Sequence, residues 1–372
     1  MKTKKPNIVF YCSWGGFGHI ARSYSIISKL PEKGSYTVAT PEGWPFKKPS
    51  KNFKYKKLHK PDSRIRFEGE KLIVQDYKKG AQDTQGYKKH LHQFIGLLKK
   101  RDPDLVVVDN PAEVSLITKI LGYKTVVMYE SLNTNDLRWR MAWQSADKLL
   151  APYPEEFLKE IDFPYLDNTY CSGGFTRFES NPESKEITTK EARKKLNLSV
   201  DEKYILVTVG KGSTAKGLIK KMLQNLTEVD HKLLLAYPDP DKEVKELSKK
   251  YESLEIIAGV FEEMYLYLVS SDIIVTGAGY NSVMEAFSFG KPTVSIPLSN
   301  IYNEQIFKAE TFSKLGALSY VNPDNPELVY EKIKELEDSR KVKEMKEAQK
   351  RVVDGSGSKR AADKLIELIQ ND

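Results

Sequence analysis

Short apolar runs alternate with amphipathic stretches along most of the chain. The first half contains runs rich in valine, isoleucine and aromatic residues at positions 8–12, 36–39, 105–108 and 125–128. Intervening stretches such as 19–30 and 84–100 space their apolar residues as a helix would. Because the runs are almost continuously apolar, they predict parallel strands covered by helices on both faces. The first half is therefore predicted to be a doubly wound α/β domain.

The same alternation returns in the second half. Its predicted strands lie at 204–209, 232–237, 254–257, 273–276, 292–296 and 317–321, with helical patterns between them. Residues 175–184 are polar and aperiodic, which is typical of a linker. We therefore predict domains at 1–174 and 189–353, a linker at 175–188 and a C-terminal helical segment at 354–372. Two such domains form a cleft between the carboxyl edges of their sheets, where folds of this kind bind ligands.

Length and composition narrow the class of protein. No apolar run of the 372-residue chain approaches the roughly 20 residues that span a bilayer. The N-terminus shows no signal-peptide pattern, so we expect a cytoplasmic location. Cys12 and Cys171 are the two cysteines, and we expect both to be reduced thiols. None of the five histidines has a cysteine at zinc-ligand spacing, so we expect no metal.

The positive charge is concentrated in the first half of the chain. The formal net charge is +8, and residues 1–170 carry +10 while the remainder carries −2. Residues 47–60 are especially rich in lysine. Two interpretations stay open: a solvated lysine-rich face, or a surface for anionic lipid, an acidic acceptor or nucleic acid.

A glycine turn in the second half carries the clearest chemical signal. Gly277 and Gly279 follow the strand at 273–276 and open an amphipathic helix. Such a turn lets backbone N–H groups approach an anion, and the helix N-terminus adds partial positive charge, so a diphosphate fits there. Glu285, about two turns into the helix, could accept hydrogen bonds from ribose hydroxyls. An ordinary βα turn with a solvated glutamate is the alternative.

A second glycine loop, at positions 13–19, follows the first strand and opens the first helix. His19 lies at that helix N-terminus, which should lower its pKa and favour a neutral general base. Asp109 ends a buried strand and could orient His19, although an Asp before Asn-Pro also suits a turn. Arg22 could bind an acidic group or be a surface residue. Glu130 has a strand-end position similar to that of Asp109.

Three further stretches lie after strands of the second half. Residues 210–214 resemble a phosphate loop but lack the Walker spacing, and neither glycine loop completes the dinucleotide fingerprint. Phe261 and the backbone after it could contact a flat base, or Phe261 could be core. Asn303 and Gln305 lie at a helix start, where an amide could bind sugar hydroxyls.

Together these positions resemble the GT-B glycosyltransferases, specifically glycosyltransferase family 28 with its lipid-linked N-acetylglucosaminyl transferases. The resemblance rests on residues 277–285, on Phe-Gly-Lys-Pro at 289–292, and on the matching placement of residues 210–213, Phe261 and Gln305. It implies two Rossmann-like domains facing each other across a cleft. The N-terminal domain would bind the acceptor and the C-terminal domain the nucleotide sugar, while the final helix could cross back to the N-terminal domain.

The resemblance also assigns roles to single residues. His19 would face the reaction centre as the catalytic base. The positions of the residues, rather than the resemblance, suggest that Asp109 supports His19 and that Arg22 and Glu130 bind the acceptor. Glu285 would bind the ribose, Gln305 the sugar, and the backbone near Phe261 and Glu262 the uracil. The predicted donor-binding residues are Gly16, Gly18, Gly210, Ser213, Phe261, Glu262, Gly277, Gly279, Tyr280, Asn281, Ser282, Glu285, Asn303 and Gln305.

The predicted function is sugar transfer from a UDP-sugar to an acceptor hydroxyl, with no metal and no cofactor besides this co-substrate. Retaining GT-B enzymes commonly carry two glutamates eight positions apart, but Gly277 stands eight before Glu285, which favours inversion. The acceptor would be lipid-linked or anionic, with the basic N-terminal domain contacting the inner face of the membrane peripherally; no nucleic acid is expected. The alternatives are a nucleotide-sugar hydrolase or epimerase of the same fold, or a non-catalytic protein that binds anionic lipid or nucleic acid.

Overall fold

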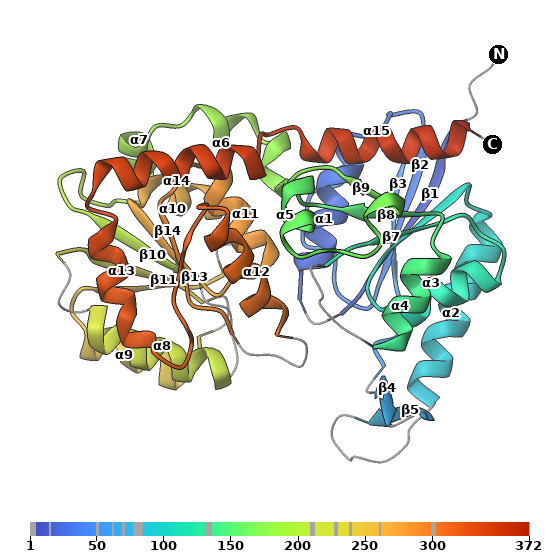
Figure 1. Cartoon of the computed structure of the whole chain (residues 1–372), viewed down its shortest axis with the longest axis horizontal. Coiled ribbons are helices and arrows are strands. Elements are labelled where there is room, and N and C mark those ends of the chain that lie inside the picture. The colour runs from blue at the N-terminus through green and yellow to red at the C-terminus, as the bar shows by residue number, and fades with distance from the viewer. Residues whose placement is uncertain are drawn as a thin grey trace.

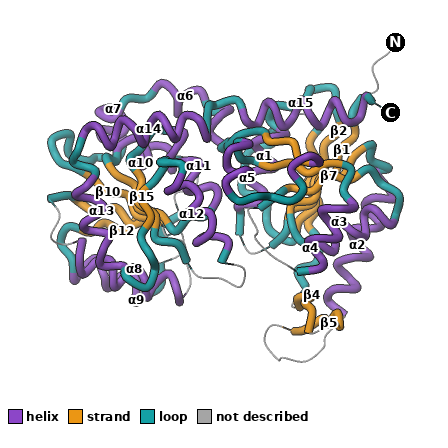
Figure 2. The backbone as a smooth tube through the Cα atoms, in the orientation of Figure 1, coloured by secondary structure: helices purple, strands orange, loops and turns teal. Residues whose placement is uncertain are grey.

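Two α/β lobes lie side by side, one blue to green and the other yellow to orange (Figure 1). This computed structural model describes residues 5–14, 16–49, 52–61, 63–68, 71–76, 85–130, 136–208, 213–226, 230–237, 240–259, 262–298 and 303–371. Each lobe has a parallel sheet at its centre with helices around it (Figure 2). The predicted pair of doubly wound Rossmann-like domains is therefore confirmed.

The N-terminal sheet has seven parallel strands in the order β3-β2-β1-β6-β7-β8-β9. The strands are β1 (Asn7–Cys12), β2 (Ser35–Thr40), β3 (Phe53–Lys57), β6 (Leu105–Asp109), β7 (Thr125–Met128), β8 (Lys148–Ala151) and β9 (Thr169–Cys171). The helices are α1 (Gly18–Ile27), α2 (Gln85–Arg101), α3 (Ala112–Ile120), α4 (Leu137–Ser145) and α5 (Glu155–Glu160), with a short 3₁₀ turn at Leu166–Asn168. A separate antiparallel hairpin, β4 (Ser63–Glu68) and β5 (Lys71–Asp76), extends from this lobe (Figure 1).

The C-terminal sheet has six parallel strands in the order β12-β11-β10-β13-β14-β15. They are β10 (Tyr204–Thr208), β11 (Lys232–Ala236), β12 (Leu254–Ile257), β13 (Ile273–Thr276), β14 (Thr293–Ser295) and β15 (Ser319–Tyr320). The helices are α8 (Ser213–Leu226), α9 (Lys242–Lys250), α10 (Met264–Ser270), α11 (Tyr280–Ser288), α12 (Glu304–Lys314), α13 (Val329–Glu335) and α14 (Ser339–Val352), with a 3₁₀ turn at Pro326–Leu328.

Burial on both sheet faces explains the continuous apolar runs. In β6, Val107 packs with Phe10 on one face, whereas Val106 and Val108 pack with Tyr11 on the other. All of these side chains are buried. Strands covered on both sides need no polar alternation, so the valine run indicated this topology correctly. The sequence interpretation missed β8 and β9, which have only four and three residues.

The segment between the sheets is more ordered than its aperiodic sequence indicated. It forms a 3₁₀ turn, η2 (Arg177–Ser180), then α6 (Pro182–Glu186) and α7 (Thr189–Lys195). Thr188 and Glu191 form a reciprocal capping box that starts α7. Phe178 and Glu179 are buried. This segment is therefore packed against both lobes rather than being a free tether.

The last helix, α15 (Gly357–Gln370), lies along the N-terminal lobe (Figure 1). Its Ala361, Ala362 and Leu365 belong to the same hydrophobic cluster as Ile8 and Phe10 of β1. A second cluster crosses between the lobes, where the rings of Phe157 and Phe312 lie 4.8 Å apart. The two lobes are thus joined by apolar packing as well as by the chain.

Two further sequence predictions concern the cysteines and membrane-spanning segments. Cys12 and Cys171 are both free thiols, as expected, and burial raises the pKa of Cys171 to about 11. Within the ranges that the structure describes, no helix combines the length and the apolar character that crossing a bilayer would require.

Candidate functional site

The loop between β1 and α1 brings His19 to the carboxyl edge of the N-terminal sheet. Gly16 has φ +153°, a conformation that L side chains rarely adopt, so the turn requires glycine there. A Cβ on Gly18 would lie 3.2 Å from Asn281 Nδ2 of the other lobe, so the backbone approaches α11 closely at this point. His19 follows directly, in the first turn of α1.

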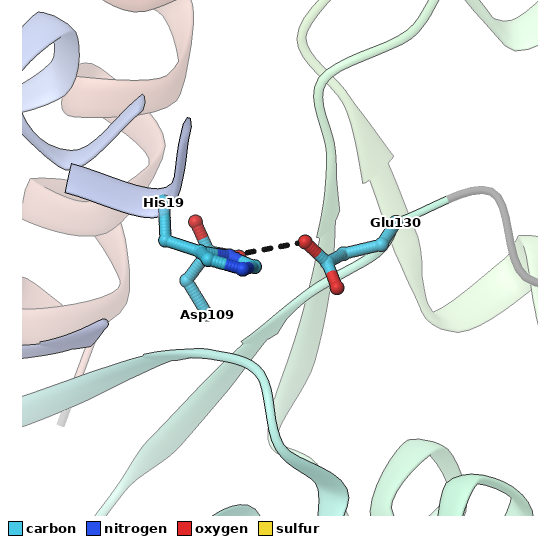
Figure 3. Close-up of side chains that lie close together, drawn as sticks. All are labelled: His19, Asp109 and Glu130. Atoms are coloured by element: carbon cyan, nitrogen blue, oxygen red, sulfur yellow. Dashed lines mark hydrogen bonds and ion pairs between the residues drawn. The ribbon is translucent and has the colours of Figure 1, made fainter. Parts of the chain in front are cut away.

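Two acidic residues converge on the His19 imidazole (Figure 3). Its Nδ1 lies 3.0 Å from Asp109 Oδ1 and 3.1 Å from Glu130 Oε1. Asp109 ends β6 and Glu130 follows β7, and the carboxyl ends of parallel strands meet at one edge of a sheet. The His19 side chain is 18% exposed, whereas Asp109 is buried. The predicted contact between Asp109 and the imidazole is therefore present, and Glu130 joins it.

Arg22, one helical turn after His19, completes this charged cluster. Its Nε donates to Asp109 Oδ2 at 2.9 Å and its Nη2 donates to Asp109 Oδ1 at 2.7 Å and also to Glu130 Oε1. The guanidinium lies over the Tyr280 ring, 5.1 Å from its centroid, and Arg22 is only 5% exposed. The prediction that Arg22 binds the acceptor is therefore corrected: its side chain is buried and neutralises the two carboxylates.

The predicted effect of the helix N-terminus on His19 is wrong. Burial alone would lower the pKa of His19, but the Glu130 and Asp109 carboxylates outweigh it and raise the pKa to about 9. Conversely, His19 and Arg22 overcome the effect of burial and hold the pKa of Glu130 well below its ordinary value. In the unliganded protein His19 is accordingly an imidazolium at neutral pH, and its Nδ1–H donates to the carboxylates.

The same three residues form a group that could hold a metal ion. Ligand atoms of His19, Asp109 and Glu130 all lie within 4.8 Å of one another. The Arg22 guanidinium, however, already donates hydrogen bonds to an oxygen of each carboxylate. An ion bound there would have to displace a buried, hydrogen-bonded cation.

The glycine turn of the C-terminal lobe faces this cluster across the domain boundary. Gly277 N donates to Thr208 O at 3.4 Å, which ties the turn to β10. Ala278 is buried with φ +62°, and Gly279 is the N-cap of α11. Asn281 Nδ2 donates to Gly18 O at 3.2 Å. The first turns of α1 and α11 therefore meet, as the predicted roles of Gly18, Gly279 and Asn281 require; Ser282, beside Asn281, is partly exposed.

Tyr280 does not face a ligand as predicted. Its hydroxyl donates to Phe175 O at 3.3 Å and accepts from Phe175 N at 3.2 Å. Its ring packs edge-on against Tyr153, and the side chain is buried. The correction has a simple physical reason: a tyrosine one residue after the N-cap points back into the apolar boundary between the lobes, where its hydroxyl finds a backbone partner.

Glu285 is also enclosed. It is 7% exposed, and its Oε1 accepts from Arg177 Nε at 2.9 Å. Burial raises the pKa of Glu285, and Arg177 opposes this effect. The predicted contact with ribose is not open in this conformation, because the carboxylate is directed toward η2. Sequence reasoning missed Arg177, which lies 108 positions from Glu285 in a segment interpreted as a linker.

Residues at the start of α12 lie near the glycine turn. Gln305 Oε1 accepts from Leu298 N at 3.2 Å, and Asn303 is exposed with φ +48°. Lys308, also missed by sequence reasoning, is buried and donates to Ala278 O at 3.3 Å and to Glu304 Oε2 at 2.9 Å. Its i,i+4 spacing from Glu304 was the available signal. Lys308 therefore fixes α12 against the turn that opens α11.

The remaining predicted donor residues are more peripheral. Glu262 is exposed before α10, and Gly16 lies within the loop between β1 and α1. Gly210 and Phe261 lie outside the described residues, as does the side chain of Ser213, whose backbone begins α8. The proposed contacts of these residues with a donor stay predictions.

The sequence of the chain is similar to those of known glycosyltransferases. Residues 204–365 match the Glycosyltransferase family 28 C-terminal domain. A UDP-N-acetylglucosamine--N-acetylmuramyl-(pentapeptide) pyrophosphoryl-undecaprenol N-acetylglucosamine transferase of Clostridium tetani is 24% identical over 367 residues, which cover 96% of this chain and 95% of the relative. An uncharacterized glycosyltransferase of Methanosarcina mazei is 25% identical over 74% of this chain and 75% of its own length.

Solved structures show the same architecture. Acinetobacter baumannii MurG superposes with a TM-score of 0.63 at 16% identity and covers 99% of this chain and 100% of its own. A UDP-glucosyltransferase from Polygonum tinctorium gives a TM-score of 0.68 at 14% identity, with full coverage of both chains. At these identities the likeness concerns the fold. Together with the sequence matches, it supports sugar transfer: the chain is a GT-B glycosyltransferase that resembles family 28.

Proposed function

We propose that this protein is an inverting glycosyltransferase that moves a sugar from a UDP-sugar to an acceptor hydroxyl without a metal ion. The observation that carries the proposal is the hydrogen bond between Asn281 Nδ2 and Gly18 O. It joins the turn expected to bind the diphosphate to the residue before His19. The proposed base on one lobe and the proposed donor site on the other are therefore close enough to act on one donor and acceptor pair.

A diphosphate suits the start of α11. The glycine turn offers backbone N–H groups, and the N-terminus of the helix carries partial positive charge. Lys308 adds a buried ammonium on the other side of Ala278. The choice of UDP follows the name of the Clostridium tetani relative, a transferase for UDP-N-acetylglucosamine.

The proposed reaction requires His19 in its neutral form. Its Nε2 would take the proton of the acceptor hydroxyl, whose oxygen then attacks the anomeric carbon from the face opposite UDP. The bond between that carbon and the UDP oxygen breaks, and UDP leaves as an anion. Asp109 and Glu130 would hold Nδ1 and stabilise the imidazolium that forms. Inversion follows from a single displacement.

Arg22 is the reason for proposing chemistry without a metal. It supplies a permanent positive charge to both carboxylates that could otherwise bind an ion. Backbone dipoles of α11 would then stabilise the departing diphosphate, which is electrostatic preorganisation. If activity persists unchanged in excess EDTA, this part of the proposal is supported; strict dependence on an added divalent ion would contradict it.

The acceptor is proposed to be lipid-linked, because the Clostridium tetani relative is named for a pyrophosphoryl-undecaprenol acceptor. Exposed apolar side chains on the N-terminal lobe support a peripheral contact with a membrane. Leu137 and Met141, one turn apart on α4, are 50% and 46% exposed, and Ile120 at the end of α3 is 83% exposed. Beside the positive charge of this half of the chain, they could enter an anionic lipid surface, which we place at the inner face of the membrane.

A thermal-shift panel tests the donor assignment. A ligand that binds only the folded state raises the apparent melting temperature, so UDP and at least one UDP-sugar should raise it, whereas ADP should not. Absence of a shift with UDP and with every UDP-sugar would remove the donor assignment. The next measurement is UDP release from the stabilising sugar nucleotide, with and without a lipid-linked or hydroxyl acceptor.

The stereochemistry and the rival activities are tested in the same reaction. Proton NMR of the product should show an anomeric configuration opposite to that of the donor. A product with the donor's configuration would contradict inversion. UDP release that proceeds equally fast without any acceptor would identify a hydrolase, and a changed sugar on unreleased UDP would identify an epimerase.

A further inference from the structure

A basic hollow lies on the N-terminal lobe, outside the His19 cluster and the glycine turn. It lies between the loop that follows β3 and the first turns of α2, has a volume of about 640 Å³ and is open to solvent. The residues that line it include His59, Gln85, Lys88, Lys89, His92 and Gln93. Every charged or titratable side chain in this set is a cation or can become one.

Lys88 and Lys89 form no ion pair among the residues that the structure describes. Other lysines of the lobe do, as Lys119 does with Asp147 at 2.7 Å and Lys60 with Glu42 at 2.9 Å. The first turn of α2 contains no acidic residue either. Lys88 and His92 are separated by four positions and so share one helix face, where one bound group could contact both side chains.

The loop that carries His59 is held rigidly against α2. His59 N donates to Gln93 Oε1 at 2.6 Å, and His59 O accepts from His90 Nδ1 at 2.7 Å. His90 Nε2 in turn accepts from the Tyr11 hydroxyl at 2.7 Å, and both Tyr11 and His90 are buried. Both backbone groups of His59 are therefore fixed, one of them through His90 to β1. Such preorganisation lowers the entropic cost of binding a ligand.

We propose that this hollow binds a phosphate group, either a phosphomonoester or the phosphate of a lipid headgroup. Hydrogen-bond donors reach it from two separate segments, the imidazole of His59 and the lysine ammonium groups of α2, so several donors can converge on one group. A phosphate offers three acceptor oxygens to them, more than a single carboxylate does. Binding of a soluble phosphate here goes beyond the proposed function, because it does not depend on sugar transfer, whereas binding of a lipid headgroup would rest on the membrane contact proposed above and give it a defined site.

The soluble form of the ligand is tested by NMR on the full chain with ¹³C-labelled histidine. The chain has only five histidines, so the imidazole signals of His59 and His92 can be assigned by single substitution. Glycerol 3-phosphate, titrated at constant pH and ionic strength, should shift these two signals saturably and leave His231 unmoved. The UDP thermal shift, measured in parallel, reports on the donor site separately.

A matched pair of double variants tests the location. K88Q/K89Q removes two charges at the hollow, and K99Q/K100Q removes two from exposed positions at the other end of the same helix. Loss of charge-assisted contacts should weaken glycerol 3-phosphate binding about tenfold in the first variant, with parent-like binding in the second. Equal thermal unfolding of both variants confirms that each is folded.

A vesicle arm distinguishes the two sources of phosphate. Cosedimentation uses vesicles of phosphatidylcholine with 20 to 30% phosphatidic acid, or of phosphatidylcholine alone. Cosedimentation that depends on phosphatidic acid and is lost in K88Q/K89Q, without any response to glycerol 3-phosphate, assigns the site to a headgroup. Saturable shifts with glycerol 3-phosphate assign it to a soluble phosphate. No response in either arm, or equal losses in the two double variants, would overturn the proposal.

Discussion

The two lobes bring different kinds of chemical groups to the boundary between them. On the N-terminal side, charged side chains from three elements meet: His19 on α1, Asp109 at the end of β6 and Glu130 after β7, with Arg22 neutralising the acids. On the C-terminal side, the glycine turn presents mainly backbone. The prominent side chains there, Tyr280 and Glu285, are directed toward Phe175 and Arg177.

This difference predicts how each side responds to amino-acid substitutions. A catalytic role that one side chain carries is lost when that residue is substituted, because no neighbouring group can take its place. A site built from backbone N–H groups tolerates many side-chain changes but depends on the geometry of the turn. We therefore expect large chemical effects from substitutions on the N-terminal side, and effects on stability or domain alignment from substitutions around α11.

The largest effect is expected for His19→Ala. Loss of a general base should lower kcat/KM by about 10²- to 10⁴-fold, while UDP still raises the melting temperature. Steady-state UDP release with acceptor measures the first quantity. His231→Ala, on the other lobe, serves as the control and should keep parent activity. An H19A variant with full transfer activity would exclude His19 as the base.

The next largest effect is expected at the buried ion pair between Arg177 and Glu285. Glu285→Ala leaves the Arg177 guanidinium buried without its carboxylate and should lower the free energy of unfolding by about 3–5 kcal/mol. Urea denaturation measures this loss. The double variant R177M/E285L replaces the pair with apolar groups and should recover most of the stability.

This double variant also separates two roles of Glu285. If it folds but no longer responds to UDP, Glu285 contacts the ribose after release from Arg177. If its response to UDP equals that of the parent chain, the ribose assignment is wrong and the pair is structural. Glu155→Ala, which breaks an exposed pair with Lys159, should change neither measurement.

A smaller and graded effect is expected from pH. The pKa of His19 is raised to about 9, so the imidazole holds its proton below that pH and only the deprotonated fraction can act as a base. That fraction increases roughly tenfold from pH 7 to 8 and about fivefold from pH 8 to 9. We expect kcat/KM to rise over this range and to level off above it. A profile that falls from pH 7 to 9 would contradict a base with this pKa.

The smallest effect is expected at the contact between the two sides. Asn281→Ala removes the hydrogen bond to Gly18 O. This loss should reduce the free energy that holds the two lobes in alignment by about 0.5–1.5 kcal/mol. The consequence would be a severalfold rise in the KM for acceptor with little change in UDP affinity. Asn325→Ala, an exposed asparagine before a 3₁₀ turn, is the matched control. Parent-like kinetics in N281A would show that the contact does not align the substrates.

Sequence reasoning identified His19, Asp109 and Glu130 because strand ends in a parallel sheet converge, and a chain pattern is enough to locate strand ends. It gave the wrong sign for the pKa of His19, since that value depends on two carboxylates located 90 and 111 positions further along the chain. Only the folded arrangement fixes the distances on which this electrostatic balance depends.

Sequence reasoning missed the burial of Arg22, Tyr280 and Glu285 for a related reason. Each of these side chains is buried against partners that come from elsewhere in the chain. For Tyr280 and Glu285 the partners are Phe175 and Arg177, in or next to a segment whose aperiodic sequence concealed its packing. Periodicity reveals faces of regular elements, but it gives no signal for short turns such as η2.

The helix α15 has a consequence for the order in which the protein can fold. Ala361, Ala362 and Leu365 complete the apolar core that begins with Ile8 and Phe10. A ribosome synthesises β1 first and α15 last, so the N-terminal lobe stays incomplete until the C-terminal lobe has been made. The N-terminal lobe is therefore synthesised first and completed last. A chain truncated before residue 357 would lose stability in the N-terminal lobe, the half that is farther from the truncation in sequence.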